Sequence, residues 1–150
     1  MASVEIEVKG LKELQDRLIK LPEKIGDKTL ASCLGSAAQV IQKEARSRVV
    51  DAAKPYKLWA KKGEERQTVS PGWLKKQIVK KRVRQSKSSA QTIITFKDKK
   101  HSFFWRYLEF GTSKMAARPF MREAFEAAKV KAVERFEERL RERLDKEEGK

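Results

Sequence analysis

The sequence has 150 residues and a mass of 17.3 kDa, a length typical of one domain with a modest hydrophobic core. Charged residues make up 38% and apolar residues 39%, so the chain can fold but carries a heavily solvated surface. With one cysteine and one histidine, Cys33 and His101, it lacks the ligand cluster of a structural zinc site. The opening residues do not resemble a signal peptide, and no apolar run is long enough to cross a membrane. We expect no metal, no cofactor, no membrane partner and synthesis in the cytoplasm.

The positive charge is concentrated in the middle of the chain. The 36 Lys and Arg against 21 Asp and Glu give +15 overall. Residues 31–100 hold 18 basic and 5 acidic side chains, or +13. Residues 101–150 hold 12 and 10, or +2, and residues 1–30 hold 6 of each. This excess predicts attraction to polyanions or to an acidic partner, confined to the middle segment.

The N-terminal part predicts a strand followed by two helices. Alternation of Val4, Ile6 and Val8 with charged residues is the pattern of a half-buried strand. Leucines at helical spacing then predict an amphipathic helix over about 11–21, ending before Pro22. Apolar residues recurring at three and four positions predict a second helix over about 23–49. Cys33 lies among its small and apolar residues, so we expect a buried side chain rather than a reactive thiol.

The middle part predicts a long loop and then a sheet. Pro55, Gly63, Pro71 and Gly72 interrupt a Lys-rich loop at about 51–73, a length that is usually functional or disordered. β-rich runs at about 78–84, 93–96 and 103–110 follow, with short polar connections between them. We predict an antiparallel meander of three strands.

The C-terminal part predicts one long helix over about 119–146. Pro119 suits its first turn, and an apolar stripe ends with Leu140 and Leu144. Its length is about 42 Å at 1.5 Å per residue, against about 38 Å for the diameter of a compact chain of this size. We therefore expect a projecting end whose stripe needs a partner chain. The expected fold is α+β, as a single domain over residues 1–150.

Aromatic residues alternate with lysines in the basic segment, which leaves two interpretations open. In the first, Tyr56, Trp59 and Trp73 stack on bases while the lysines neutralise phosphates, as in single-strand binders. Alternatively, the aromatics anchor the loop to its own or a neighbouring subunit and the lysines keep the surface soluble. The candidate phosphate contacts are Lys54, Lys57, Lys61, Lys62, Lys75, Lys76, Lys80 and Lys81.

Catalytic motifs are missing from the sequence. It contains no Walker-type glycine loop, no H-E-x-x-H and no G-x-S-x-G. His101 would act as a general base only if Glu109 or Asp98 converged on it, as a small basic nuclease would require. A lone histidine in a turn of this kind is more often a solvated surface residue. We expect no enzymatic activity.

The most specific stretch runs from Phe103 to Ala124. As a strand, residues 103–110 would have two apolar faces, and such a strand lies between helices or between subunits. Gly111 permits a tight exit, a polar loop follows, and Pro119 restarts the chain as a helix. Glu109 and Arg118 flank the loop, which predicts an ion pair across it.

This strand, loop and helix resembles the pattern Y-x-E/Y-F-G-T…R-P-F-M/L-R-x-A of the neck or tail-completion proteins of long-tailed bacteriophages, the minor-tail-protein-Z-like family. The matching residues are Tyr107, Glu109, Phe110, Gly111, Thr112, Arg118, Pro119, Phe120, Met121, Arg122 and Ala124. The segment from Gly72 to Ile78 is similar to the family's G-x-L-x-x-S-I segment. Gln77 replaces a usual Ser and Glu123 a frequent Pro, so we expect local differences there.

The resemblance implies a non-enzymatic virion protein that joins the head to the tail, forming a homo-oligomeric ring around the DNA channel. It implies as partners a head-connector or stopper protein and a tail-terminator or tail-tube protein. The matching residues would form the subunit interface, and the basic segment would touch DNA without reading its sequence. The alternative is a small, sequence-independent nucleic-acid-binding protein.

Overall fold

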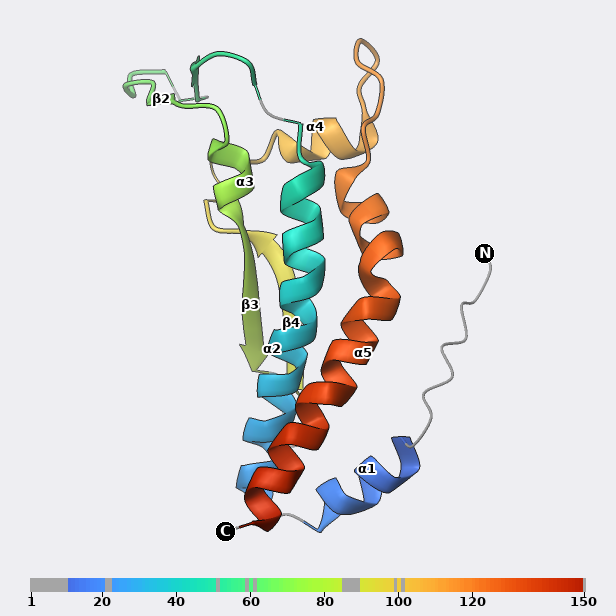
Figure 1. The fold of residues 1–150 in the computed structure, drawn as a ribbon. Helices are drawn as coiled ribbons and strands as arrows, with labels where there is room; N and C mark the ends of the chain where they lie inside the picture. The colour runs from blue at the N-terminus through green and yellow to red at the C-terminus, as the bar shows by residue number, and fades with distance from the viewer. Residues whose placement is uncertain are drawn as a thin grey trace. The chain divides into compact units, whose positions relative to one another are not determined.

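The computed structural model describes residues 11–20, 23–50, 52–58, 60, 62–84, 90–98, 100 and 102–149. The strand predicted at residues 4–8 lies outside them. In chain order (Figure 1) the elements are α1 (Leu11–Ile19), α2 (Glu23–Arg48), β1 (Tyr56–Lys57), β2 (Thr68–Val69), α3 (Trp73–Gln77), β3 (Ile78–Arg84), β4 (Ala90–Phe96), α4 (Trp105–Phe110) and α5 (Phe120–Glu148). The predicted α+β class and the ranges of the three longest predicted helices are confirmed.

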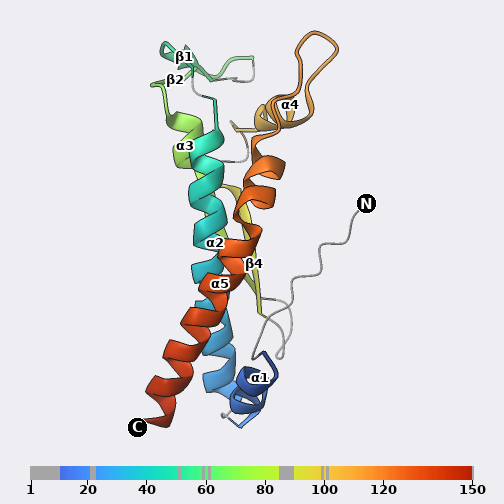
Figure 2. The same cartoon turned by 45° about the vertical axis from the view of Figure 1, so that its right-hand side comes forward.

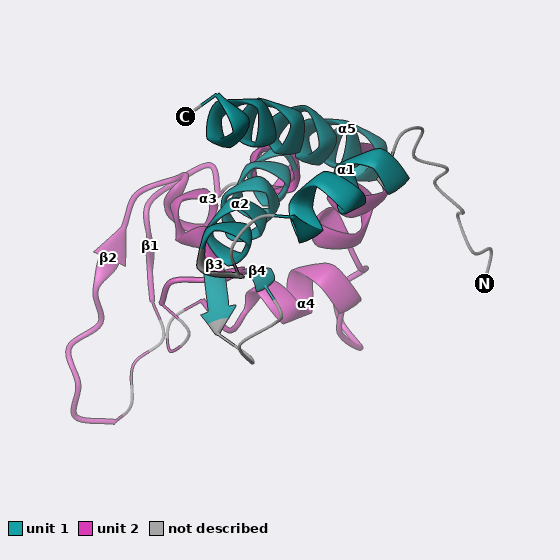
Figure 3. Cartoon of the chain, turned by 90° about the horizontal axis from the view of Figure 1, so that it is seen from below, with its two compact units in different colours: residues 1–40, 82–93, 129–150 teal, residues 41–81, 94–128 magenta. Residues whose placement is uncertain are grey.

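The chain divides into two compact units, coloured separately in Figure 3. Unit 1 comprises residues 1–40, 82–93 and 129–150, and unit 2 comprises residues 41–81 and 94–128. All the residues of the family-like motif, and all the candidate phosphate contacts, belong to unit 2. The organisation as one domain over residues 1–150 stays a prediction.

The core of unit 1 is formed by α1, α2 and α5. Its buried residues are Leu14, Cys33, Leu140 and Leu144, with Leu18 and Phe136 packed against them. The expectation that the C-terminal stripe needs a partner chain is therefore wrong for Leu140 and Leu144. The leucines of α1, spaced to line one helical face, cover them within the same chain.

An ion-pair cluster also joins α1 to α5 in unit 1. Arg17 Nη2 lies 2.6 Å from Asp145 Oδ1 and 2.7 Å from Glu148 Oε2. The hydrogen bonds that Arg17 donates to these carboxylates raise the pKa of Arg17, and the same hydrogen bonding lowers the pKa of Glu148. The two carboxylates are exposed and the guanidinium is half-buried, so salt screens much of their attraction.

The core of unit 2 combines the end of α2, α3, the sheet and the start of α5. Its buried residues are Ala45, Val49, Leu74, Ile78, Phe96, Phe120 and Ala124. β3 pairs with β4 and the two strands run antiparallel (Figure 1). The amide of Lys97 donates to Gln77 O at 2.8 Å, next to the end of the strand pair. The Gln77 side chain also accepts from the amide of Asp98, so the glutamine in place of serine serves the entry to the sheet.

One backbone carbonyl at the start of β3 receives three side-chain donors from α2. Gln42 Nε2 donates to Ile78 O at 2.8 Å, and Arg46 donates to the same oxygen through Nε at 3.1 Å and Nη2 at 2.7 Å. A buried carbonyl without a partner is costly, and donors that carry charge make the strongest hydrogen bonds. These contacts fix the beginning of β3 against α2.

The predicted third strand is wrong, because residues Trp105–Phe110 form helix α4. Helical bonds run from the amide of Tyr107 to Phe104 O at 2.9 Å and from that of Gly111 to Tyr107 O at 2.9 Å. Phe104, Trp105 and Leu108 pack against the core, a spacing of one and four residues that suits a helix. A short apolar run fits both the two-residue period of a strand and the 3.6-residue period of a helix, and packing decides which one forms.

The basic loop at 51–73 contains a short hairpin, visible near the end of α2 in Figure 2. Tyr56 pairs with Val69 and Lys57 with Thr68 in antiparallel register. The amide of Leu58 donates to Gln67 O at 2.8 Å, and the Leu58 and Val69 side chains are buried. The hairpin is therefore held to unit 2 by apolar side chains as well as by its own hydrogen bonds.

Candidate functional site

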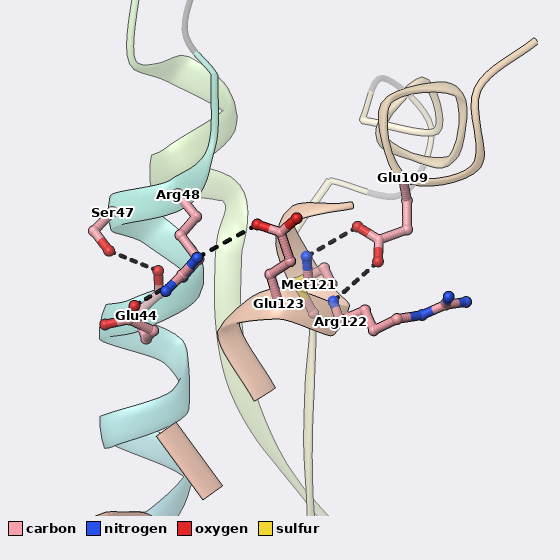
Figure 4. A network of polar contacts seen from close by, with 7 residues as sticks. All are labelled: Glu44, Ser47, Arg48, Glu109, Met121, Arg122 and Glu123. Atoms are coloured by element: carbon pink, nitrogen blue, oxygen red, sulfur yellow. Dashed lines mark hydrogen bonds and ion pairs between the residues drawn. The ribbon is translucent and has the colours of Figure 1, made fainter. Parts of the chain in front are cut away.

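Glu109 ties α4 to the start of α5. Its side chain is 6% exposed, and its two carboxylate oxygens accept hydrogen bonds from backbone amides, Oε2 from Met121 at 2.9 Å and Oε1 from Arg122 at 3.0 Å (Figure 4). The first amides of a helix have no partner within the helix, and the helix dipole favours a negative charge beside them. Glu109 is therefore the N-terminal cap of α5, supplied from another helix.

The predicted ion pair between Glu109 and Arg118 is not formed among the described residues. Both Glu109 oxygens are taken by the amides of α5. Arg118 contributes its backbone instead, and its amide donates to Leu108 O at 2.7 Å. Its side chain is exposed. The start of a helix, with its free amides, competes better for the carboxylate than a solvated guanidinium does.

Gly111 is required by the turn that leaves α4. Its φ is 72° and its ψ is −177°, a region that is essentially restricted to glycine. A Cβ at this position would lie 2.8 Å from Ala117 N and 2.8 Å from Met115 O. Beyond it, Thr112 and Met115 exchange backbone hydrogen bonds and close a tight turn. The chain can therefore return at once to α5.

The other motif residues divide into a buried and an exposed set. Phe120 is buried in the core of unit 2, Met121 packs against that core, and Pro119 is half-buried before the helix. Tyr107 is 49% exposed and Phe110 is 66% exposed, on the side of α4 turned away from the core. Thr112 and the Arg122 side chain are exposed as well. The buried set holds α4 and α5 together, and the exposed set is available to a partner.

An apolar pocket of about 470 Å³ lies on unit 2. We call it the unit-2 pocket. The end of α2, the hairpin, α3 and the inner side of α4 contribute its walls, which include Val50, Tyr56, Leu58, Leu74, Phe104 and Leu108. Large exposed apolar surfaces of this kind mark binding sites more often than scattered apolar residues do.

The described lysines of the candidate phosphate contacts lie on the hairpin segment, α3 and β3. The exposed ones are Lys54, Lys57, Lys62, Lys76, Lys80 and Lys81; Lys75 is half-buried, and Lys61 lies outside the described residues. The structure thus brings several of them to neighbouring elements of one unit. It does not assign them a ligand.

Two of the three aromatic residues in the basic segment pack inside the chain. Tyr56 meets Phe104 edge-on, with ring centroids 6.2 Å apart, and Trp73 stacks on Phe104 at 6.3 Å. Trp59 lies outside the described residues. The interpretation as anchors is therefore confirmed for Tyr56 and Trp73, which hold the segment to their own chain.

A comparison with models of protein families shows which family the chain belongs to. A family model described as "Bacteriophage HK97-gp10, putative tail-component" matches residues 12–111, two thirds of the 150 residues. The chain belongs to this bacteriophage tail-component family. The match includes α4, the basic segment and the motif through Gly111, and the resemblance to a phage neck or tail-completion protein is consistent with it. No match was found among curated proteins or among solved structures.

The structure describes one of the two residues expected to act together in a nuclease. Glu109, the proposed partner of His101 in a nuclease, is engaged by backbone amides, and His101 itself lies outside the described residues. The described part of the chain holds no group of three His, Cys, Asp or Glu that could bind a metal ion.

The side chain of Cys33 is 0% exposed, as predicted, and burial raises the pKa of its thiol. Among the described residues, no helix is long and apolar enough to cross a membrane.

Among the residues of the unit-2 pocket, Tyr56 and Lys57 were predicted from sequence as candidate nucleic-acid contacts, and its leucines were not predicted as site residues. The signal that points to them is the pairing of apolar residues in a basic, irregular stretch, with Leu58 beside Trp59 and Leu74 beside Trp73. Such residues need an apolar surface to pack against. Phe104 and Leu108 supply it, because residues four positions apart lie on the same side of a helix. The donors Gln42 and Arg46 carry no sequence signal, because their acceptor is a backbone carbonyl.

Proposed function

We propose that the chain is a non-enzymatic virion protein that joins the phage head to the tail, acting as a ring of copies around the DNA channel. Membership of a tail-component family supports this proposal. The observation that carries it is the exposed aromatic surface of α4, Tyr107 and Phe110, on a helix held rigidly by Glu109 and Gly111. Aromatic side chains on a rigid support are typical centres of protein interfaces.

The interface follows from the buried and exposed sets of the motif. Glu109, Gly111 and Phe120 determine where α4 lies relative to the start of α5. Tyr107 and Phe110 are thereby presented to a neighbouring molecule without the entropy loss of ordering a loop on binding. The remaining partners would be a head-connector or stopper protein on one side and a tail-terminator or tail-tube protein on the other.

Electron microscopy of a phage that lacks this chain tests the joining role. We expect DNA-filled heads and separate, complete tails, and we expect joining to return when purified protein is added. Normally joined particles, or a block before head filling, would contradict the proposal. Native mass spectrometry of the purified chain, alone and with heads, tests the ring directly.

The basic segment supports a contact with DNA in the channel, and also the alternative function as a sequence-independent nucleic-acid-binding protein. Neutralising phosphates releases counterions, so binding weakens steeply with salt, by a log–log slope of roughly 0.9 per contact on duplex DNA. The described lysines carry this charge on exposed surfaces of unit 2.

Charge reversal separates the two functions. The variant changes Lys54, Lys62, Lys76 and Lys81 to Glu. Its matched control makes the same change in charge at four exposed lysines of unit 1, namely Lys12, Lys20, Lys28 and Lys131. We expect only the first variant to lose salt-sensitive DNA retention, with ring formation kept in both. Equal retention by the two variants would remove the DNA contact from the proposal. A wild-type monomer with micromolar DNA affinity would favour the alternative function.

A further inference from the structure

We propose that the unit-2 pocket receives the Phe110 side chain of a second copy of the chain. The inference rests on the proposed ring assembly and names the residues that make its repeating contact. The surface that projects is the Phe110 side of α4, and the surface that accepts it is the pocket formed by the hairpin, the end of α2, α3 and the opposite side of α4.

The pocket suits an aromatic ring. Its volume of about 470 Å³ lies within the range of about 300–1,000 Å³ that is usual for pockets holding small organic molecules. Its walls include Val50, Leu58, Leu74 and Leu108, with the ring of Phe104 beside them. An aromatic side chain gains from such surroundings by burying apolar area and by offset or edge contacts with another ring.

Phe110 cannot fill the pocket of its own copy. At 100° per residue, Phe110 lies about 160° around α4 from Leu108 and about 120° from Phe104. Leu108 and Phe104 line the pocket, whereas Phe110 is 66% exposed. The projecting and accepting surfaces therefore point in different directions from one short helix. A contact between them joins two copies head to tail, which is the geometry that closes into rings.

A second copy explains both surfaces with one contact. Each copy then covers its neighbour's pocket and has its own Phe110 covered in turn. A different protein in the pocket would leave Phe110 exposed on every copy. This reciprocity favours a copy of the same chain as the occupant.

The area of the contact predicts how the free protein behaves. Aromatic side chains cover about 150–250 Å² each, and Tyr107 and Phe110 are 49% and 66% exposed. Together they offer about 250 Å², and the contact buries about 500 Å² over both partners, well below the roughly 1,200 Å² of a stable pair. A pair held by this contact alone dissociates readily. Ring closure or a head surface that gathers several copies makes the assembly stable.

Two complementary variants test the contact. Phe110→Asp removes the projecting side chain and leaves the pocket intact, whereas Ala52→Trp fills the pocket from its exposed wall and leaves Phe110 intact. Sedimentation at about 100 μM is expected to show oligomers for the wild type and monomers for each variant alone. An equimolar mixture of the two variants keeps only one pairing of surfaces, so chemical crosslinking, which traps a pair that dissociates readily, is expected to give dimers and nothing larger. Ala127→Trp, an exposed alanine on α5, is the matched control and keeps the oligomers.

The outcomes distinguish this inference from the ring proposal. Oligomers of the Phe110→Asp variant, or a mixture that yields no crosslinked dimer, would overturn the pocket contact and leave ring assembly in place. A wild type that stays monomeric at 100 μM and in the presence of heads would overturn both. Circular dichroism confirms that each variant is folded. If one is not, a photo-crosslinking phenylalanine at position 110 replaces it. Crosslinks to the pocket walls of a second copy support the contact, and crosslinks elsewhere refute it; the walls are Val50, Ala52, Tyr56, Lys57, Leu58, Leu74, Phe103, Phe104 and Leu108.

Discussion

The carboxylate of Glu109 accepts a hydrogen bond from the backbone amide of Arg122 at 3.0 Å, across 13 residues of chain. Helix caps are usually supplied by a residue directly before the helix. Here the cap comes from the preceding helix, so one carboxylate fixes the distance between α4 and α5. The turn between them, Gly111 to Arg118, has no freedom to move the helices apart while this bond exists.

Replacing Glu109 should destabilise the protein, because its buried carboxylate caps α5. Glu109→Ala leaves two amides of α5 without a partner in a buried site, which costs about 1–3 kcal/mol in the free energy of unfolding. Glu109→Gln keeps one oxygen acceptor and is expected to cost less. Urea unfolding measures both, with Glu134→Gln on the exposed side of α5 as the control. A Glu109→Ala variant as stable as the control would contradict the capping role.

Gly111 should not tolerate a side chain. Gly111→Ala places a Cβ 2.8 Å from two backbone atoms at a φ of 72°, and the strain is expected to cost at least about 2 kcal/mol. Gly35→Ala is the matched control, because nothing lies within 4 Å of its added Cβ in the middle of α2. That change is expected to stabilise the chain by about 0.5–1 kcal/mol. Thermal unfolding of the two variants should therefore shift in opposite directions, and a common shift would refute the strain.

Leu144 should stabilise the isolated chain. Its side chain is 0% exposed in the core of unit 1, and Leu144→Ala is expected to cost about 2–5 kcal/mol by removing buried methyl groups. The control is Val130→Ala, whose side chain is 49% exposed on the same helix. Dilute protein, at which oligomers dissociate, is the sample to use. Loss of stability only at high concentration would mean that a partner chain covers Leu144 after all.

Cys33 should react with thiol reagents only when unit 1 opens. Burial raises the pKa of its thiol, so the reactive thiolate is disfavoured in the native state. The unfolded thiol ionises near pH 8.5. The stability due to the protonated buried thiol is therefore fully present below that pH and is lost as the pH rises towards the folded pKa. Cys33→Ala should flatten the alkaline part of the stability curve. Rapid labelling of native protein at pH 7 would contradict the buried position.

The sequence predicted the elements whose apolar spacing extends over several turns. The leucines of α1 and the stripe of α5 repeat often enough to determine both helices. Their mutual packing was not predictable, because spacing alone does not say whether Leu140 and Leu144 meet the same chain or another. The run from Phe103 to Phe110 is too short to separate a strand from a helix, and its packing against Phe96 and Phe120 decides the outcome.

Several residues of the candidate site could be predicted from the sequence, but their roles could not. Glu109, Gly111 and Phe120 stand out from the sequence, but a cap across 12 and 13 residues needs coordinates to be seen. Glu109 was expected to pair with Arg118 because opposite charges flank a loop, yet free helix amides attract the carboxylate more strongly. The unit-2 pocket is assembled from four separate segments, so no local sequence pattern predicts it.

The three donors on Ile78 O have a consequence for how copies can associate. Successive carbonyls of a strand point to opposite edges, and since Gln77 O accepts from Lys97, Ile78 O faces the edge of β3 away from β4. Gln42 and Arg46 occupy that carbonyl, so an incoming strand finds no free acceptor at the start of β3. Natural sheets protect their edges in this way against uncontrolled growth. At this carbonyl of β3, an incoming strand would have to compete for the hydrogen bond with two side chains of the same chain.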